Sequence, residues 1–356
     1  MLGTLCERLE DPHQLFPILR GLWNYYLVRA EYQTAYTLGE DLLCLAHQAQ
    51  DAPMLPAAHR ALGSTLFYLG AAASAQTHFA QGIALYDPQQ HRPLAFLHGE
   101  DAGVMCRSYA AWTLWFLGYP AQGRRQMDEA LALAQQLAHP FSLSFALGAA
   151  AMFHQLCREE RFTQKRAEAA LSLTEEQGFP FFMALSALLH GWALARQGQA
   201  KEGIEQMHQG LVAHRATGAE MLRPYLRALL AEAHGTLGEL EAGLTVLTGA
   251  LTLADTTGER WYEPELYRLK GELLLAQSPD NHTETETCFQ HAISIAQNQS
   301  AKSWELRTST SLARLWQHQG KRDEARQVLG DVYGWFTEGF DTADLKDAKA
   351  LLDALG

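Results

Sequence analysis

Long hydrophobic runs are missing from this sequence of 356 residues. The longest apolar stretches, residues 141–153 and 181–195, are shorter than the roughly 20 residues that a helix needs to span a bilayer. The start, MLGTLCERLEDPH, also lacks the basic and apolar regions of a secretory signal. These absences predict a cytoplasmic protein.

Basic residues are in the minority, with 28 Lys and Arg against 40 Asp and Glu and a formal net charge of −12. This balance disfavours phosphate backbones and anionic lipids as main partners. We therefore expect no nucleic acid partner and no membrane partner. The five cysteines are scattered and form no CxxC pair. Such cysteines are typical of small buried side chains in a reducing compartment.

A short turn recurs about every forty residues, each time after an apolar segment. One interval, between the turns at 70 and 118, is longer by eight residues. Each half-unit has helical periodicity, and we find no convincing strand pattern. The sequence therefore predicts eight helix–turn–helix units of an α-solenoid. The turns read LFYLG at Gly70, LWFLG at Gly118, ALARQG at Gly198, AHGTLG at Gly238 and LWQHQG at Gly320, with weaker copies near 30, 158 and 279.

We expect a single superhelix over residues 1–356 rather than separate domains. A final segment, 340–356, is predicted to form a helix that caps the array, as terminal repeats do in solenoids. The predicted units lie near residues 12–50, 53–87, 99–138, 140–178, 179–218, 220–258, 261–299 and 301–338.

Small residues recur at fixed offsets within the units. Gly63 is followed twelve residues later by Ala75, then by Phe79 and Gly82. Glycine inside a helix costs about 1 kcal/mol relative to alanine, so repeated mid-helix glycines indicate close contact between two helices. The pattern resembles the tetratricopeptide repeat and favours it over the HEAT and armadillo types. Three further units share it: Ala111, Gly123, Met127 and Ala130; Gly191, Gly203, Met207 and Gly210; and Ala231, Gly243, Leu247 and Ala250.

Longer stretches resemble one particular family. They include GLWNYYLVRAEYQTA, GIALYDPQQHRPLAFLHGEDAGVMC, RATGAEMLRPYLRALLAEA and VYGWFTEGFDTADLKDAKALL. Together they are similar to the C-terminal tetratricopeptide region of bacterial signal-transduction ATPases, which often carry a class III adenylate or guanylate cyclase domain at the front. The resemblance covers essentially the whole chain. It implies a sensor or partner-binding arm whose nucleotide chemistry belongs to upstream domains.

Familiar catalytic and metal-binding motifs are lacking. The sequence has no GxxxxGK(S/T) phosphate loop, no HExxH motif and no Cys–His cluster. We therefore expect no catalytic residue, no metal and no cofactor. The insert between the second and third units gathers His91, His98 and Asp101. We expect a polar loop there whose aspartates and prolines cap helices, with a metal or small-ligand site and a partner contact as alternatives.

The first helix of each unit in a stacked solenoid lines a concave surface suited to peptides or partner domains. Counting along these helices predicts a groove that is aromatic in its N-terminal half and charged in its C-terminal half. An exposed aromatic cluster usually marks a contact surface, whereas a tight superhelix would turn the same rings into core. The sequence is compatible with both a contact surface and a core. The predicted groove residues are Arg60, Tyr68, Trp112, Trp115, Trp192, Arg196, Glu232, Arg268, Glu272, Arg307 and Arg314.

The leading hypothesis is a non-catalytic interaction and regulatory module of a bacterial signalling ATPase or nucleotide cyclase. Its partner is a protein or peptide, and upstream ATPase or cyclase domains of the same polypeptide are one candidate. The first alternative is a sensor for a small ligand or peptide. The second is an enzyme on a helical solenoid that uses the groove and the loop from His91 to Asp101.

Overall fold

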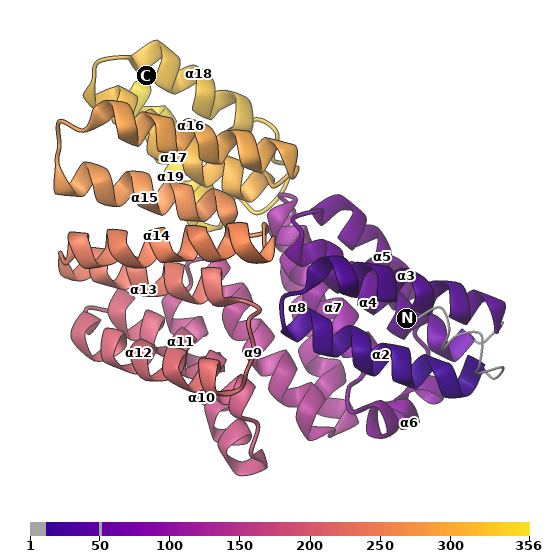
Figure 1. The fold of residues 1–356 in the computed structure, drawn as a ribbon. Coiled ribbons are helices and arrows are strands. Elements are labelled where there is room, and N and C mark those ends of the chain that lie inside the picture. The colour runs from indigo at the N-terminus through magenta and orange to yellow at the C-terminus, as the bar shows by residue number, and fades with distance from the viewer. Residues whose placement is uncertain (1–11, 50–51) are drawn as a thin grey trace.

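The computed structural model describes residues 12–49 and 52–356. Within these ranges the chain forms eighteen α-helices, one short 3-10 helix and no strand (Figure 1). None of these helices combines the length and the apolar character needed to cross a bilayer. In Figure 1 the chain runs from the indigo N-terminal helices through the magenta helices to the yellow C-terminal ones.

Consecutive helices pack as antiparallel pairs joined by short turns. The first four pairs are α2 (Pro12–Val28) with α3 (Tyr32–Gln48), α4 (Leu55–Tyr68) with α5 (Ala72–Ala84), α7 (Ala102–Phe116) with α8 (Pro120–Leu137), and α9 (Pro140–Leu156) with α10 (Glu160–Gln177). The other four are α11 (Pro180–Arg196) with α12 (Ala200–Ala216), α13 (Arg223–Leu237) with α14 (Leu240–Thr257), α15 (Glu263–Gln277) with α16 (His282–Asn298), and α17 (Lys302–His318) with α18 (Arg322–Tyr333).

Three elements stand outside the pairs: η1 (Ala52–Met54), α6 (Pro88–His98) in the insert and α19 (Ala343–Leu355) at the C-terminus. The last of these packs on α17 and α18. This arrangement confirms the prediction of an all-α solenoid of about eight helix–turn–helix units with a C-terminal helix that caps it.

In most pairs, the first helix ends at a residue with a left-handed backbone conformation, at the turn that the sequence predicted. At Gly70, φ is 78°, a conformation that glycine adopts without steric cost. The Gly70 N–H donates to Phe67 O at 3.0 Å and the Ala71 N–H to Leu66 O at 2.9 Å, which is the Schellman pattern. Positive φ also occurs at the corresponding residues Ala30, Gly118, Arg158, Gly198, Gly238 and Gly320.

Glycines lie where two helix backbones approach each other. A Cβ atom on Gly191 would lie 2.7 Å from the Gly203 carbonyl oxygen and 2.7 Å from Met207 Cγ. A Cβ atom on Gly63 would lie 2.6 Å from the Phe79 ring. Real Cβ atoms do not approach heavy atoms this closely, so a larger residue at either position would force the facing helix or ring to shift. The close helix contact predicted from the small-residue offsets is confirmed.

The insert forms a helix, so the expectation of a polar loop is wrong. Pro88 occupies the first turn of α6, where proline is favoured because no N–H is needed. The Asp87 side chain caps this helix by accepting from Gln89 N at 2.8 Å. Asp101 caps α7 in the same way, accepting from Val104 N at 2.8 Å. The prediction that aspartates and prolines of the insert cap helices is confirmed.

The superhelix is wound tightly enough for its two halves to meet. The last carbonyls of a helix have no partner within the helix and need an external donor. In this protein, N–H and O–H groups of the C-terminal half donate hydrogen bonds to carbonyls at the ends of α2, α4, α7 and α9. The contacts run from Glu220 N and Met221 N to Val28 O (2.9 and 3.1 Å), from Arg260 N to Tyr68 O (2.8 Å), from Ser303 Oγ to Trp115 O, and from Arg307 Nη2 to Leu156 O (2.6 Å).

Candidate functional site

The aromatic half of the predicted groove is part of the core. Tyr68, Trp112, Trp115 and Trp192 are between 1% and 4% exposed. The expectation that these rings form an open contact surface is therefore wrong for this structure, and the alternative of a tight superhelix applies. The Trp112 indole donates to Ala149 O at 3.1 Å, so its polar atom is also satisfied inside the core.

Two tryptophans of the C-terminal half close this part of the groove. Trp261 lies 5.1 Å from the Phe67 ring and 5.7 Å from the Phe116 ring. Trp304 packs edge-on against Trp115 at 4.8 Å. Such ring contacts add to the large apolar area that each ring buries. Neither tryptophan is among the predicted groove residues, although Trp261 lies just before α15 and Trp304 lies in the first turn of α17.

The charged half of the groove holds a small cavity, which we call the central pocket. Its volume is about 130 Å³. Five of the predicted groove residues come together here, from α11, α13, α15 and α17. The lining residues are Gln155, Arg158, Trp192, Arg196, Glu232, Glu265, Arg268 and Arg307.

Arg307 is a buried residue of the central pocket. Its guanidinium donates to Asp344 of the capping helix α19 at 2.6 and 3.0 Å, and lies 4.9 Å from the centre of the Trp304 ring. Burial lowers the pKa of Arg307, but the carboxylates of Asp344 and Glu265 raise it by more. Burial likewise raises the pKa of Asp344, and Arg307 and Arg158 bring it below its usual range. Both groups therefore stay charged.

Arg268 forms ion pairs with two glutamates of its own helix, α15. Its guanidinium donates to both oxygens of Glu265 at 2.7 and 2.8 Å and to Glu272 at 3.2 Å. Burial lowers the pKa of Arg268, but Glu265 and Glu272 raise it by more. Glu272 also accepts from Ser311 Oγ at 2.6 Å. This guanidinium is thus already saturated by the protein's own carboxylates.

Arg196 is the least engaged cation of the central pocket. Its nearest carboxylate oxygens belong to Glu160 at 3.5 Å and Glu232 at 3.7 Å, which is outside ordinary hydrogen-bond distance. Glu232 instead accepts a 2.7 Å hydrogen bond from Trp192 Nε1. About 30% of the Arg196 side chain is exposed. This guanidinium can therefore accept a further anionic partner without first breaking a tight ion pair.

Six predicted groove residues do not line the central pocket: the core residues Tyr68, Trp112 and Trp115, together with Arg60, Glu272 and Arg314. Arg60 belongs to another cluster, where it lies 4.4 Å from the Trp23 ring centre and donates to Glu100 at 2.9 Å. The Tyr68 hydroxyl meets the Tyr109 hydroxyl at 3.1 Å in the core. Glu272 contacts the pocket residue Arg268, while Arg314 is about half exposed, with Asp347 at 3.8 Å.

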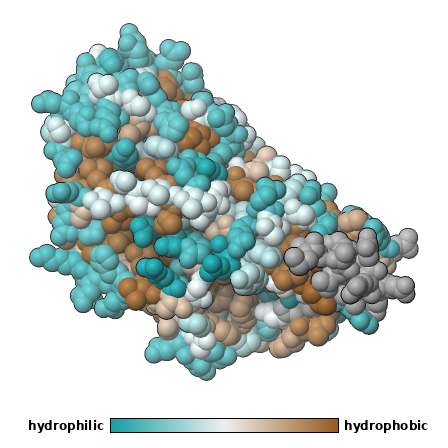
Figure 2. All heavy atoms as spheres, viewed as in Figure 1, coloured by the Kyte–Doolittle hydropathy of each residue, from teal (hydrophilic) through white to brown (hydrophobic). Residues whose placement is uncertain are grey.

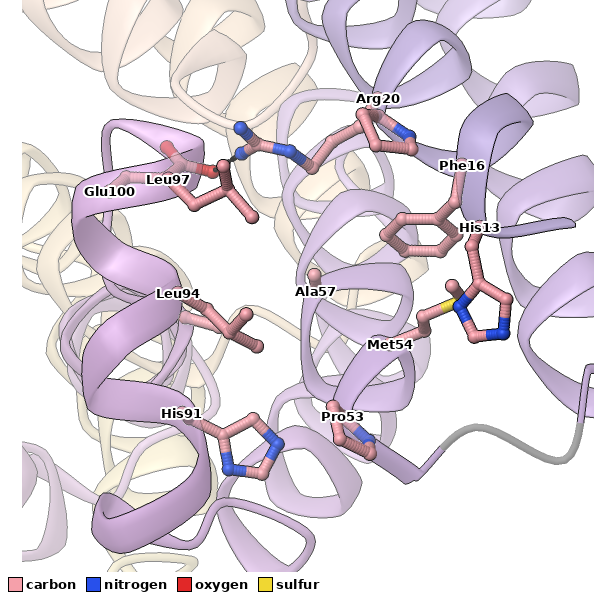
Figure 3. A pocket seen from close by; sticks show the side chains of 12 residues that line it. His13, Phe16, Arg20, Pro53, Met54, Ala57, His91, Leu94, Leu97 and Glu100 are labelled. Atoms are coloured by element: carbon pink, nitrogen blue, oxygen red, sulfur yellow. Dashed lines mark hydrogen bonds and ion pairs between the residues drawn. The ribbon is translucent and has the colours of Figure 1, made fainter.

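A second cavity lies between α2, α4 and the insert helix α6 (Figure 3), and we call it the insert pocket. Its volume is about 250 Å³. In Figure 3, Leu94 and Leu97 of α6 face Phe16 and Met54 across the cavity, and the Arg20–Glu100 ion pair of 2.9 Å lies at one end. It is lined by His13, Phe16, Pro17, Arg20, Pro53, Met54, Ala57, His91, Leu94, Leu97, Glu100 and Ala102.

The three predicted insert residues have different surroundings. His91 is 4% exposed, its Nδ1 contacts the Asp87 backbone at 2.8 and 2.9 Å, and its Nε2 has no partner. Asp101 caps α7 and accepts from the Tyr86 hydroxyl at 2.8 Å, and burial raises its pKa. The side chain of His98 lies outside the described part of the structure. Among the described residues, no group of three His, Cys, Asp or Glu side chains could hold a metal.

Comparison with solved structures shows the fold. A Rap protein complexed with competence and sporulation factor matches with a TM-score of 0.61 and 8% identity, covering 96% of each chain. The Rap conjugation gene regulator of the plasmid pLS20, in complex with the Phr* peptide, matches with a TM-score of 0.60 and 8% identity, covering 97% of this chain and 98% of that one. Identities this low establish the tetratricopeptide-like solenoid and nothing finer.

A signal-transduction ATPase with a tetratricopeptide repeat sensor, from Pyrococcus horikoshii, has a TM-score of 0.49 and 15% identity, covering 98% of this chain and 50% of that one. Because this score is below 0.5, the relation to signalling ATPases stays a prediction. No protein-family model and no curated protein matches the sequence.

Proposed function

We propose that this chain is a non-catalytic interaction and regulatory module, which binds a peptide or a partner segment through the central pocket. The observation that carries the proposal is Arg196, whose guanidinium has no close ion pair in a pocket otherwise filled with paired charges. Of the two Rap structures with this fold, one is complexed with competence and sporulation factor and the other with the Phr* peptide. That likeness supports a peptide as the occupant.

The size of the central pocket limits how much of a partner it holds. A volume of about 130 Å³ is equivalent to roughly four water molecules at about 30 Å³ each. One side chain or one chain terminus fits this space. The rest of the segment would lie along the charged first helices, since the aromatic half of the groove is closed by Trp261 and Trp304.

The chemistry of Arg196 favours a carboxylate as the anchoring group. A guanidinium donates two parallel hydrogen bonds to a carboxylate, and such charge-assisted pairs are about twice as strong as neutral ones. The paired neighbours Arg268 and Arg307 keep their own carboxylates. An acidic side chain or the C-terminal carboxylate of the partner therefore fits the pocket.

The wider setting follows from the resemblance of the sequence. We place the module in the cytoplasm of a bacterium, as the regulatory arm of a signalling ATPase or nucleotide cyclase. An upstream ATPase or cyclase domain of the same polypeptide is then one candidate partner. A segment of such a domain, carrying an exposed carboxylate, would release or engage the pocket as the signalling state changes.

Peptide selection tests this proposal. A displayed random peptide library is panned on the wild-type chain, and the affinities of selected peptides are measured by fluorescence anisotropy. Arg196→Ala should weaken binding by about tenfold or more, the equivalent of losing one charged hydrogen bond. Arg161→Ala, an exposed arginine on α10, is the matched control. Equal affinities for the wild type and Arg196→Ala would contradict the proposal.

A second candidate function, small-ligand sensing, is favoured by the insert pocket. The cavity of about 250 Å³ is mainly apolar, and the buried Nε2 of His91 has no hydrogen-bond partner there. A buried polar atom without a partner is costly unless a ligand or water satisfies it. A small apolar ligand with one hydrogen-bonding group suits this combination.

Filling the insert pocket tests this second candidate. Ligands from a fragment screen by NMR should lose binding in Ala57→Trp, which places a ring inside the cavity. The exposed Ala73→Trp is the control. Binding that survives Ala57→Trp in a folded protein would rule out the insert pocket as the site.

A further inference from the structure

A third cavity lies between the fifth and sixth helix pairs, apart from the two pockets described above. It has a volume of about 290 Å³ and lies between α12 and α13, with one wall from α14. None of its residues lines the central pocket or the insert pocket. We call it the arginine pocket. The lining residues are His208, Leu211, Val212, His214, Arg215, Arg223, Arg227, Leu230 and Val246.

Three guanidinium groups gather at this cavity in a protein whose net charge is −12. Glu220 forms an ion pair with Arg223. Within the described residues, no carboxylate forms an ion pair with Arg215 or Arg227, and neither side chain makes a hydrogen bond. Burial lowers the pKa of Arg227, and the neighbouring charges of Arg223 and Arg215 lower it further. The pocket therefore carries unbalanced positive charge.

A buried histidine adds an unused hydrogen-bonding atom. His214 is 1% exposed, packs 5.4 Å from the Phe181 ring, and lines the cavity. Its Nε2 has no partner. Burial and the charge of Arg223 lower the pKa of His214 to about 4, so the ring is neutral at pH 7. A neutral imidazole can present an N–H at this position and donate it to an oxygen of a ligand.

Apolar side chains form the rest of the wall. Leu230 is buried, whereas Val212 is 72% exposed and open to a ligand. Leu211 and Val246 lie at the same cavity. The arginine pocket thus combines cations with apolar side chains, and it suits a ligand that has both an anionic group and an apolar group.

We propose that the arginine pocket binds a small organic phosphate monoester. Its dianion lies among Arg215, Arg223 and Arg227 and accepts from His214 Nε2, while its apolar group contacts Val212 and Val246. Three guanidinium groups and the Glu220 carboxylate leave two positive charges. A phosphate monoester carries about −1.5 to −2 at pH 7, which matches that excess better than a single carboxylate does.

The site lies between two helix pairs, so a ligand there contacts both. Arg215 belongs to α12, and Arg223 and Arg227 belong to α13. Without a ligand these like charges repel one another across the contact between the pairs. A bound dianion replaces that repulsion with attraction, and a ligand that binds only the folded state raises its stability.

Titration calorimetry with phenyl phosphate as the probe tests the proposal on the full chain. The wild type should bind it saturably, with affinity that falls as salt rises. Arg227→Gln and Arg215→Gln should each weaken binding by about tenfold or more, because each removes charged hydrogen bonds to the anion. Arg161→Gln on α10 should leave the affinity unchanged. Circular dichroism and melting temperature verify that each variant is folded, and the exposed Arg215→Gln keeps the test valid if Arg227→Gln misfolds.

Further titrations separate the contributions of the phosphate group and the apolar group to the affinity. Inorganic phosphate should bind more weakly than phenyl phosphate, and phenol should not bind. Vesicles containing phosphatidic acid should bind no better than vesicles without it. The proposal is overturned if phenyl phosphate does not bind at millimolar concentrations, if Arg215→Gln and Arg227→Gln both bind it as the wild type does, or if only the vesicles bind.

Discussion

Glu259 offers the sharpest test of how the two halves of the superhelix are held together. This glutamate is 1% exposed and lies between α14 and α15. Its carboxylate accepts from the Tyr32 hydroxyl at 2.7 Å, from Trp261 Nε1 at 2.8 Å and from Leu222 N at 3.0 Å. It therefore joins the first residue of α3 to two loops of the C-terminal half.

The protonation state of Glu259 determines how this contact depends on pH. Burial raises its pKa from 4.5 to about 7, although the three donors favour the charged form. A carboxyl whose pKa is raised by folding contributes stability below its unfolded pKa and loses that contribution as the pH rises through the folded pKa. A shift of this size corresponds to about 3 kcal/mol. The contribution of Glu259 to the free energy of unfolding therefore falls between about pH 4.5 and just above pH 7.

Urea unfolding from pH 5 to pH 8 measures this effect in the wild type and in Glu259→Gln, whose side chain does not titrate. The free energy of unfolding of the wild type should fall by up to about 3 kcal/mol relative to the variant as the pH rises. Histidines with lowered pKa values, such as His59 and His214, are present in both proteins and cancel in the difference. The exposed Glu241→Gln is the control. Parallel curves for the wild type and Glu259→Gln would refute the reasoning.

Other predictions concern the core and the central pocket. Trp112→Ala and Trp192→Ala should each lower the free energy of unfolding by about 3–5 kcal/mol, since both rings are buried, and unchanged urea midpoints would show that they are exposed in solution. Gly191→Leu should cost at least about 3 kcal/mol through overpacking against a facing backbone carbonyl; circular dichroism and melting like the wild type would invalidate the repeat register. Asp344→Asn leaves the buried Arg307 charge short of its main partner and should cost about 3–5 kcal/mol in calorimetric unfolding, whereas a neutral result would mean that α19 is not docked there.

The repeat architecture could be predicted because it depends on local signals. Gly70 and Gly118 mark turns whose φ values favour glycine, and Gly191 and Gly203 mark a close helix contact. These requirements act within one helix pair, so they leave a pattern that recurs in the sequence. The gathering of Arg196, Glu232, Arg268 and Arg307 followed from the same register.

The closure of the superhelix could not be predicted in this way. It depends on the small rotation between neighbouring pairs, which accumulates over several units and leaves no local signal. From the sequence alone, the rings of Trp115 and Phe116 fit a groove or a core equally well, and the structure makes them core because Trp304 packs against Trp115 and Trp261 packs against Phe116. The insert was misjudged because its prolines suggested a loop, although Pro88 occupies a helix position that tolerates proline.

A double-mutant cycle between Arg196 and the acidic residue of a selected peptide tests the central claim most directly. Affinities are measured for the wild type and Arg196→Ala, each with the acidic peptide and with its amide counterpart. A direct ion pair in the central pocket predicts a coupling energy of about 1.5–3 kcal/mol. A coupling energy near zero, with both proteins folded, would show that the partner segment does not bind through this pocket.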